Sequence, residues 1–202
     1  MAFKKYVAPT AETVLPEDPE ALRELLEAAD PARRVQAVNA LARLEGTAPI
    51  LVAHLARESQ PNVRESLLLQ LSRQLEPAVV TALLALLRSE DVALRSEVCA
   101  TLQQMDARIA PAVRPLLQDE DHDVRQFAVE ILAVLDHPEV PDWMLEVLHH
   151  EPEANVVAAA ANCLRGSRLP EARAALDEVT ARFPEDDYLL FVVASVRADL
   201  ED

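Results

Sequence analysis

Few side chains in this sequence could do chemistry, and the five histidines are the first to consider. An imidazole beside a carboxylate can ligate iron, and His150-Glu151 is the one His-Glu dipeptide. No second pair supplies the remaining ligands, since the other histidines are His54, His122, His137 and His149. The dipeptide also precedes Pro152, at an expected helix end, where a histidine interacts favourably with the helix dipole. The pattern therefore predicts a C-terminal helix cap and no metal site.

Nucleophilic catalysis has no better candidate. Cys99 and Cys163 lie 64 residues apart, with no CxxC or Cys/His pairing that would indicate a zinc site or a disulfide framework. Neither has a basic residue at helical spacing that would clearly lower its pKa, so both are predicted to be buried apolar residues. No serine lies on a recognisable nucleophile turn. We therefore expect no catalytic residue and no cofactor.

The composition narrows the class of protein. The 202 residues are 50% hydrophobic but only 3% aromatic, with two glycines, which favours helices and excludes a glycine-rich phosphate loop. A net charge of −16 argues against nucleic acid as a partner, because such binding needs a basic face. No stretch reaches the roughly 18 apolar residues of a membrane span. We expect a cytoplasmic protein with no membrane partner.

An internal repeat is the strongest signal. An acidic or amide residue is followed four positions later by arginine and seven further on by leucine, as in DPARRVQAVNAL from Asp30. The copies start at Asp30, Gln60, Asp91 and Asp121, with a degraded fifth at Glu153 and a weak sixth at Glu185. The motif arginines are Arg34, Arg64, Arg95 and Arg125, and Val157 occupies the fifth position.

Each period also holds a helical segment before the motif, and most of these segments open with proline, which suits a first helical turn. They read PEALRELLEAA, APILVAHLARES, PAVVTALLALLRS, IAPAVRPLLQ, PDWMLEVLHH and PEARAALDEVTARF. Two helices of about 10 to 14 residues fill a period, and neither can bury its apolar stripe alone. The sequence predicts an all-α fold, an α-solenoid of six hairpins whose second helices start near Asp30, Pro61, Asp91, Asp121, Glu153 and Glu185.

The motif resembles the short bacterial HEAT-like repeats first associated with phycobilisome lyases. The resemblance rests on D-x-x-V-R-x-x-A-x-x-x-L, matched by Asp121, Val124, Arg125, Ala128 and Leu132, and it covers residues 17 to about 200. It implies an architecture rather than a function, because this family includes lyases, hydroxylases, glycosylases and many adaptors. Hydroxylases of this type use several His-Glu dipeptides, whereas this chain has one. The glycosylases use a basic face, which the net charge of this chain opposes.

The motif arginines have a structural interpretation. Asp30/Arg34, Asp91/Arg95 and Asp121/Arg125 keep a spacing of four residues, which suits an ion pair along one helix. We expect these arginines to form a ladder, paired along their own helix and with the neighbouring repeat. The aspartates are also expected to cap the second helices.

The positions of a partner site follow from the same register. Counting the motif arginine as position zero, positions +3, +4, +7 and +10 are apolar and expected in the core. Positions +2 and +5 then point to the concave face. The partner-binding residues predicted there are Gln36, Asn39, Leu69, Glu97, Phe127, Glu130 and Asn162. Phe127 and Leu69 either anchor a partner or are buried by local curvature.

Charge adds a preference for one kind of partner. Residues 119–202 hold 6 basic and 20 acidic groups, whereas residues 1–118 hold 13 and 15. The excess of acidic residues in the later repeats forms either a solvated surface or a surface that steers a basic or helical segment of another protein to these repeats. Residues 1–19 form an extended segment before a single repeat array at 20–202, and it either caps the array or binds a partner. We expect a non-catalytic scaffold or adaptor; the alternative is a lyase-like or maturation factor for a chromophore- or cofactor-bearing protein.

Overall fold

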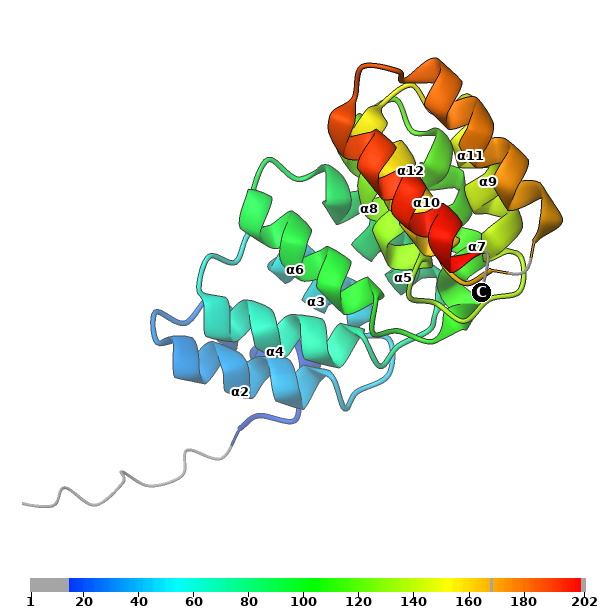
Figure 1. The fold of residues 1–202 in the computed structure, drawn as a ribbon. Helices are drawn as coiled ribbons and strands as arrows, with labels where there is room; N and C mark the ends of the chain where they lie inside the picture. The colour runs from blue at the N-terminus through cyan, green and yellow to red at the C-terminus, as the bar shows by residue number, and fades with distance from the viewer. Residues whose placement is uncertain (1–14, 168, 201–202) are drawn as a thin grey trace, which may run out of the picture. The chain divides into compact units, whose positions relative to one another are not determined.

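The structure, a computed structural model, describes residues 15–167 and 169–200, which contain twelve α-helices and no strand. The chain divides into two compact units, residues 1–71 and 72–202 (Figure 1). Within each unit the helices pair into antiparallel hairpins, and each unit is a stretch of α-solenoid. The predicted all-α fold class is therefore confirmed.

The first unit contains two hairpins. Helices α1 (Pro19–Leu25) and α2 (Pro31–Leu41) form one, and α3 (Ala48–Leu55) and α4 (Pro61–Leu71) form the other. The second helices α2 and α4 pack against each other and bury Ala37, Val38 and Leu41 with Leu67 and Leu71. Gly46 turns the chain between the hairpins at a φ of 74°, a backbone conformation that favours glycine.

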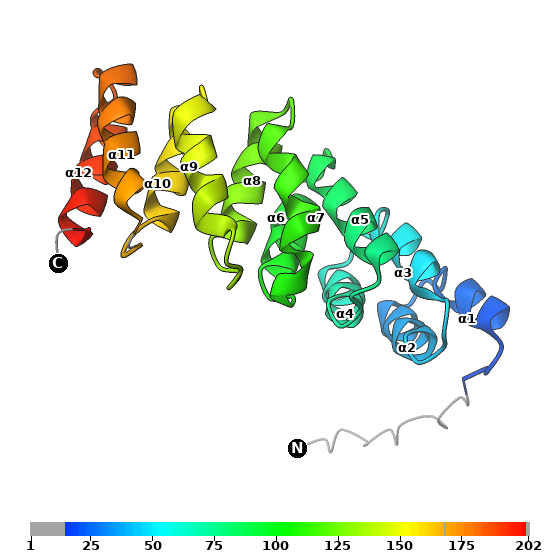
Figure 2. The same ribbon diagram turned by 90° about the vertical axis from the view of Figure 1, so that its right-hand side faces the viewer.

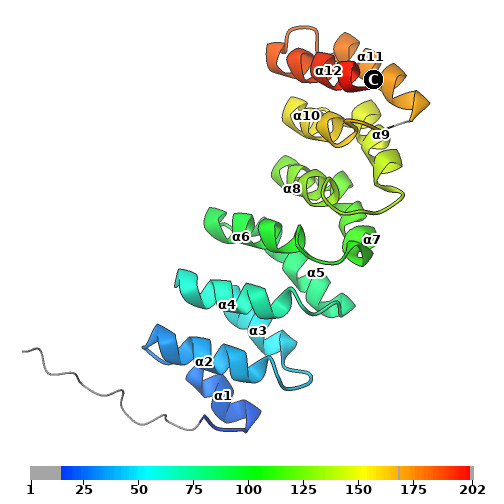
Figure 3. The same ribbon diagram turned by 60° about the horizontal axis from the view of Figure 1, so that its bottom comes forward.

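The second unit contains four hairpins in two layers (Figures 2 and 3). Its first helices are α5 (Pro77–Ala85), α7 (Ala110–Val113), α9 (Val140–His150) and α11 (Pro170–Arg182). Its second helices are α6 (Val92–Leu102), α8 (His122–Leu132), α10 (Ala154–Cys163) and α12 (Asp187–Asp199). In Figure 3 the second helices lie side by side in one layer, and α6 contacts α8, α8 contacts α10, and α10 contacts α12. We call their exposed side the second-helix face.

The predicted helix starts are confirmed within two residues, and the capping chemistry explains why. The Asp30, Asp91 and Asp121 carboxylates accept backbone N–H groups at 2.9 to 3.0 Å in the first turns of α2, α6 and α8. Asp186 does the same for α12, where its carboxylate accepts from the N–H of Leu189. Glu153 precedes α10 without such a bond.

The first helix of the fourth hairpin differs from the prediction. The segment expected to form one helix, residues 109–118, contains only the four α-helical residues of α7, between the 3-10 turns Ala107–Ile109 and Arg114–Gln118. Pro115 lies inside the second of these turns and has no N–H to donate, so the α-helix cannot continue through it. Helices α1, α3 and α5 are also shorter than the 10 to 14 residues expected.

The core follows the predicted register. Positions +3, +4 and +7 after each motif arginine are buried in all four copies, whereas position +10 is buried at Met105 and Leu135 but only half-buried at Leu44 and at the polar Gln74. Most of the predicted N-terminal segment, residues 1–14, lies outside the described residues. In the part of the chain that the structure describes, no helix has both the length and the apolar character needed to cross a membrane.

Candidate functional site

The second helices are held in place by a hydrogen bond that recurs at every motif arginine. Each guanidinium donates to the backbone carbonyl six residues earlier in the chain, in the turn that leads into its own helix. The distances are 2.7 Å for Arg34 to Ala28, 2.6 Å for Arg64 to Glu58, 3.0 Å for Arg95 to Ser89 and 2.9 Å for Arg125 to Asp119. The arginine therefore fixes the turn between the two helices of its hairpin.

Two of these arginines also make a bidentate ion pair with the next hairpin. Nε of Arg34 lies 2.8 Å from one carboxylate oxygen of Glu58, and Arg125 holds Glu151 in the same way at 2.8 Å. Both glutamates are almost fully buried, at 5% exposure. The predicted pairing with the neighbouring repeat is therefore confirmed for the first and fourth copies.

The expected pairing within one helix is wrong for the first and fourth copies. The carboxylates of Asp30 and Asp121 accept backbone N–H groups of their own first turns, so these short side chains are already engaged. The longer arginines reach Glu58 and Glu151 instead.

Glu58 is a highly connected polar group. Burial alone would raise its pKa, but hydrogen bonds from Arg34, His54 and the N–H groups of Gln60 and Ser59 outweigh burial and lower the pKa to about 2. His54, itself only 4% exposed, places Nε2 3.1 Å from the Glu58 carboxylate. The carboxylate is therefore ionised at neutral pH and holds the first two hairpins together.

In the fifth copy the missing arginine is replaced from another helix. Val157 occupies the motif position and is fully buried. Arg182, at the end of α11, donates to the carbonyl of Glu151, which lies six residues before Val157, and also to the carbonyl of Leu148. The hydrogen bond to the turn is thus kept although the motif residue is lost.

The seven predicted partner-binding residues lie outside the core, as expected for positions +2 and +5. Gln36, Leu69 and Asn162 are exposed, and Asn39, Glu97, Phe127 and Glu130 are half-buried. The first unit holds Gln36, Asn39 and Leu69, and the second holds Glu97, Phe127, Glu130 and Asn162.

Several of these residues link neighbouring second helices. The side-chain Oδ1 of Asn39 accepts a hydrogen bond from the side-chain amide of Gln70 at 2.8 Å, which joins α2 to α4. Gln103, just after α6, donates to the backbone carbonyl of Glu130 at 3.1 Å, and the Glu130 carboxylate accepts from Gln126 at 3.0 Å. These hydrogen bonds connect neighbouring second helices within each unit, and Phe127 is neither a core residue nor fully exposed.

The sequence reasoning missed the two aromatic residues that are most exposed in the described part of the chain. Phe191 and Tyr188 on α12 are 72% and 60% exposed. Phe191 occupies position +2 of the weak sixth copy, the position that Phe127 occupies in the fourth. Extending the same count by one repeat would have found it.

The residues weighed for chemistry have structural explanations. Burial raises the pKa of Cys99 to about 12, with a contribution from Glu130, and raises the pKa of Cys163 to about 11. His150 ends α9 and its Nδ1 lies 2.9 Å from the Glu146 carbonyl oxygen, as expected for a residue capping a helix end. Its neighbour Glu151 is the buried partner of Arg125.

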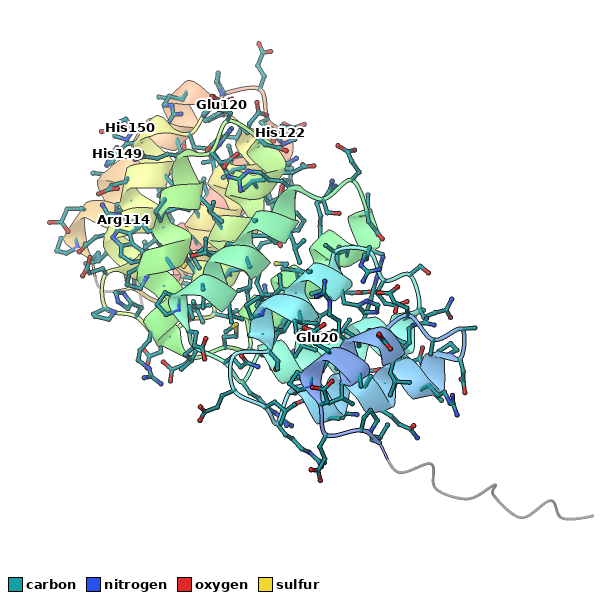
Figure 4. All side chains as sticks on the ribbon, turned by 180° about the vertical axis from the view of Figure 1, so that it is seen from behind. Glu20, Arg114, Glu120, His122, His149 and His150 are labelled. Carbon is teal, nitrogen blue, oxygen red and sulfur yellow. The ribbon has the colours of Figure 1, made fainter. Side chains whose placement is uncertain are left out.

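One compact group among the described residues could hold a metal ion by its geometry, namely Asp121, His122 and Asp123. Asp121 already accepts from the N–H of Asp123 as the cap of α8. His122 is the first residue of α8 and lies near Glu120 in Figure 4. The geometry of this group is that of a helix start.

A groove of about 530 Å³ lies on the opposite, first-helix layer of the second unit. Its lining includes Leu117, Trp143 and Val147, with Arg125 and Glu151 in one wall. Arg114, whose guanidinium lies 5.2 Å from the centre of the Trp143 ring, is on the same side of the unit as His149 and His150 (Figure 4). The ion pair of Arg125 with Glu151 already satisfies the charges in that wall.

Comparison with known proteins agrees with this geometry. Residues 109–190 match the family model of HEAT repeats. The archaeal HEAT-like repeats protein from Thermococcus onnurineus NA1 is 16% identical, with 92% of this chain and 88% of that chain covered and a TM-score of 0.52. An engineered protein is 18% identical, with 91% and 96% covered and a TM-score of 0.41. No curated protein matches the chain.

Stacked hairpins with a recurring arginine in each second helix define a helical repeat protein. More narrowly, residues 109–190 match HEAT repeats, and the fold of the chain is similar to that of a HEAT-like repeat protein. HEAT repeats generally mediate protein–protein interactions, because stacked hairpins present extended surfaces to a partner.

Proposed function

We propose that this protein is a non-catalytic scaffold or adaptor that binds another protein along its second-helix face. The observation that carries the proposal is the presence of Phe127 and Phe191 at the same repeat position, outside the core, on an ordered helical surface. Phe191 is 72% exposed, so most of its apolar surface is not used to stabilise the fold, and exposed apolar side chains serve as anchors in interfaces.

The charge of the chain supports a protein partner over a nucleic acid. The formal net charge is −16, and the second-helix face carries Glu97 and Glu130 beside Phe127. Phosphate backbones are bound by basic surfaces, so this face would repel them.

The alternative, a lyase-like or maturation factor, receives less support from the side chains. A thiol that binds or transfers a chromophore must ionise, and the pKa values of Cys99 and Cys163 are raised to about 12 and about 11. Both thiols are therefore protonated at neutral pH.

The experiment begins with affinity capture from the source organism, followed by affinity measurements on the purified partner. Phe127→Ala and Glu130→Arg are expected to weaken the complex, whereas Glu171→Arg on α11 in the other layer is the matched charge control. Circular dichroism should stay unchanged, and the melting temperature should fall less than for Leu132→Ala, a fully buried residue whose loss costs about 2–5 kcal/mol. A partner whose affinity is insensitive to both variants on the face would contradict the proposal.

A further inference from the structure

Helix α12 exposes more aromatic surface than the rest of the described chain. The sequence has only four Phe, two Tyr and one Trp, and the structure describes five of these seven residues. Trp143 is buried, and Phe127 and Phe183 are half-buried, but Tyr188 and Phe191 stand out at 60% and 72% exposure. The two most exposed of the five described aromatic residues therefore lie close together on one helix.

The two rings belong to one stripe of α12. Tyr188 and Phe191 are three residues apart and therefore neighbours on the helix surface. Beyond them the same stripe carries small side chains, Ala194, Ser195 and Ala198. Aromatic anchors followed by small residues leave room for a partner's backbone to lie close to the helix.

The adjacent helices extend this surface. Helix α10 contacts α12 on one side and α8 on the other, and its outward residues include Ala159 and Asn162. Helices pack about 8–10 Å apart, so the axes of α8 and α12 are about 20 Å apart across α10. A helical segment of about 13 residues spans that distance at 1.5 Å per residue.

The edge of this surface is acidic. The turns that enter α8, α10 and α12 place exposed carboxylates in successive repeats, which are Glu120, Asp121, Glu153, Glu185 and Asp187. Asp187 lies four residues before Phe191 and hence on its side of the helix.

The nearby arginines do not cancel this charge. Arg125 is paired with Glu151, Arg165 with Asp199 and Arg197 with Asp177. Arg182 is bound to backbone carbonyls. With 6 basic and 20 acidic groups in residues 119–202, the excess of negative charge is available to a cationic partner.

We infer that α8, α10 and α12 bind a basic amphipathic segment of a partner protein, with its apolar side chains on Phe191, Tyr188 and Phe127 and its lysines or arginines facing the acidic edge. The inference rests on the proposed function and specifies the chemistry of the partner. Electrostatic attraction brings the segment to the surface, and the aromatic residues hold it.

The test uses the full chain and three fluorescent 18-residue model peptides at physiological salt. The first is an amphipathic helix of leucine and lysine, the second replaces lysine with glutamate, and the third replaces leucine with glutamine. We expect the leucine–lysine peptide to bind at least tenfold more tightly than either control peptide. Equal binding of the lysine–glutamine peptide would overturn the inference, because it would show attraction by charge alone.

Matched variants locate the binding surface. Phe191→Ser should weaken binding of the leucine–lysine peptide at least tenfold, whereas Val134→Ser, at an apolar residue just after α8 that is 59% exposed, should change this binding less than twofold. The double variant Glu185→Gln/Asp187→Asn should weaken peptide binding and reduce the dependence of this binding on salt. Both effects should be larger than those of the double variant Glu139→Gln/Glu171→Gln in the first-helix layer. Equal effects of the two acidic pairs would overturn the inference.

Two further measurements exclude other occupants. A peptide of residues 1–16, which contains Phe3, Lys4, Lys5 and Tyr6, should compete less well than the leucine–lysine peptide for binding to the chain. If the chain self-associates, Phe191→Ser should leave that self-association unchanged. Either contrary result would assign the surface to the chain itself. If a captured partner is sensitive to Phe127→Ala but not to Phe191→Ser, this inference fails while the proposed function stands.

Discussion

Arg182 at the end of α11 takes the place of the arginine that Val157 lacks on α10. Its guanidinium donates to the Glu151 carbonyl, at the same distance along the chain from position 157 as the carbonyls bound by the four motif arginines. The turn before α10 is therefore fixed from the following hairpin rather than from its own helix.

This relationship predicts that Arg182→Met destabilises the last two hairpins. The substitution leaves the carbonyls of Glu151 and Leu148 without their charged donor, at a cost of about 1–3 kcal/mol. Arg108→Met is the control, because Arg108 is exposed and its ion pair with Asp106 contributes little. Urea unfolding and amide exchange in α10 measure the difference, and equal effects of the two variants would show that the hydrogen bonds of Arg182 do not matter.

The buried carboxylate of Glu58 predicts a dependence of stability on pH. Its pKa is about 2 in the folded chain against an ordinary 4.5, so the unfolded chain binds the proton more readily. The stabilisation is fully present above pH about 4.5 and is lost as the pH falls through about 2. It amounts to about 3 kcal/mol by linkage.

Amide exchange in α2 and α4 tests this directly. Glu58→Gln should reduce protection strongly at pH 7, because it leaves the charge of Arg34 without its partner, and the difference from the unmodified chain should shrink toward pH 2. Glu65→Gln, at an exposed position on α4, is the control. A loss of protection that is the same at pH 7 and pH 2 would mean that ionisation of Glu58 is irrelevant.

The thiols should react slowly in the native chain. Burial raises the pKa of both Cys99 and Cys163, so few thiolates exist at pH 8, and Cys99 is the more buried. We expect an aromatic disulfide reagent to modify Cys163 before Cys99, and both far more slowly than in urea. A fast native burst from either cysteine would revive the lyase-like alternative.

We expect the purified chain to carry no stoichiometric iron or zinc. The one geometric candidate among the described residues, Asp121 with His122 and Asp123, is exposed at a helix start, and Asp121 already acts as the cap. Elemental analysis gives the answer, and about one metal per chain, lost in His122→Ala, would contradict the non-catalytic proposal.

The sequence predicts the hairpins well because several local signals coincide in each repeat. Asp30, Asp91 and Asp121 are at once the start of the motif and the cap of a helix, so the register and the helix boundary support each other. The apolar pattern of residues 109–118 predicts a single helix, but Pro115 interrupts the α-helical hydrogen bonds of this segment. The first helices α3, α5, α9 and α11 lack a side-chain cap hydrogen bond, so their starts are less well defined in the sequence.

The partners of the arginines could not be read from spacing alone. Glu58 and Glu151 lie 24 and 26 residues after Arg34 and Arg125, and only the stacking of hairpins brings them together. In sequence each is one acid among 35. The sequence also does not indicate that Arg182 replaces the missing motif arginine, because its hydrogen bonds connect one hairpin to the preceding one. The position of Phe191 on the second-helix face can be predicted from the sequence, because Phe191 occupies the same repeat position as Phe127.

The origin of the Arg182 hydrogen bonds has a consequence for how the C-terminal end of the array frays. In a repeat protein with nearest-neighbour coupling, terminal repeats open one at a time, each losing only its own interface. Here opening of α11 and α12 also withdraws the guanidinium from the turn before α10, so the hairpin of α9 and α10 is weakened in the same event. We therefore expect the last two hairpins to open together, and a chain that ends between α10 and α11 to lose protection in α9 and α10 as well.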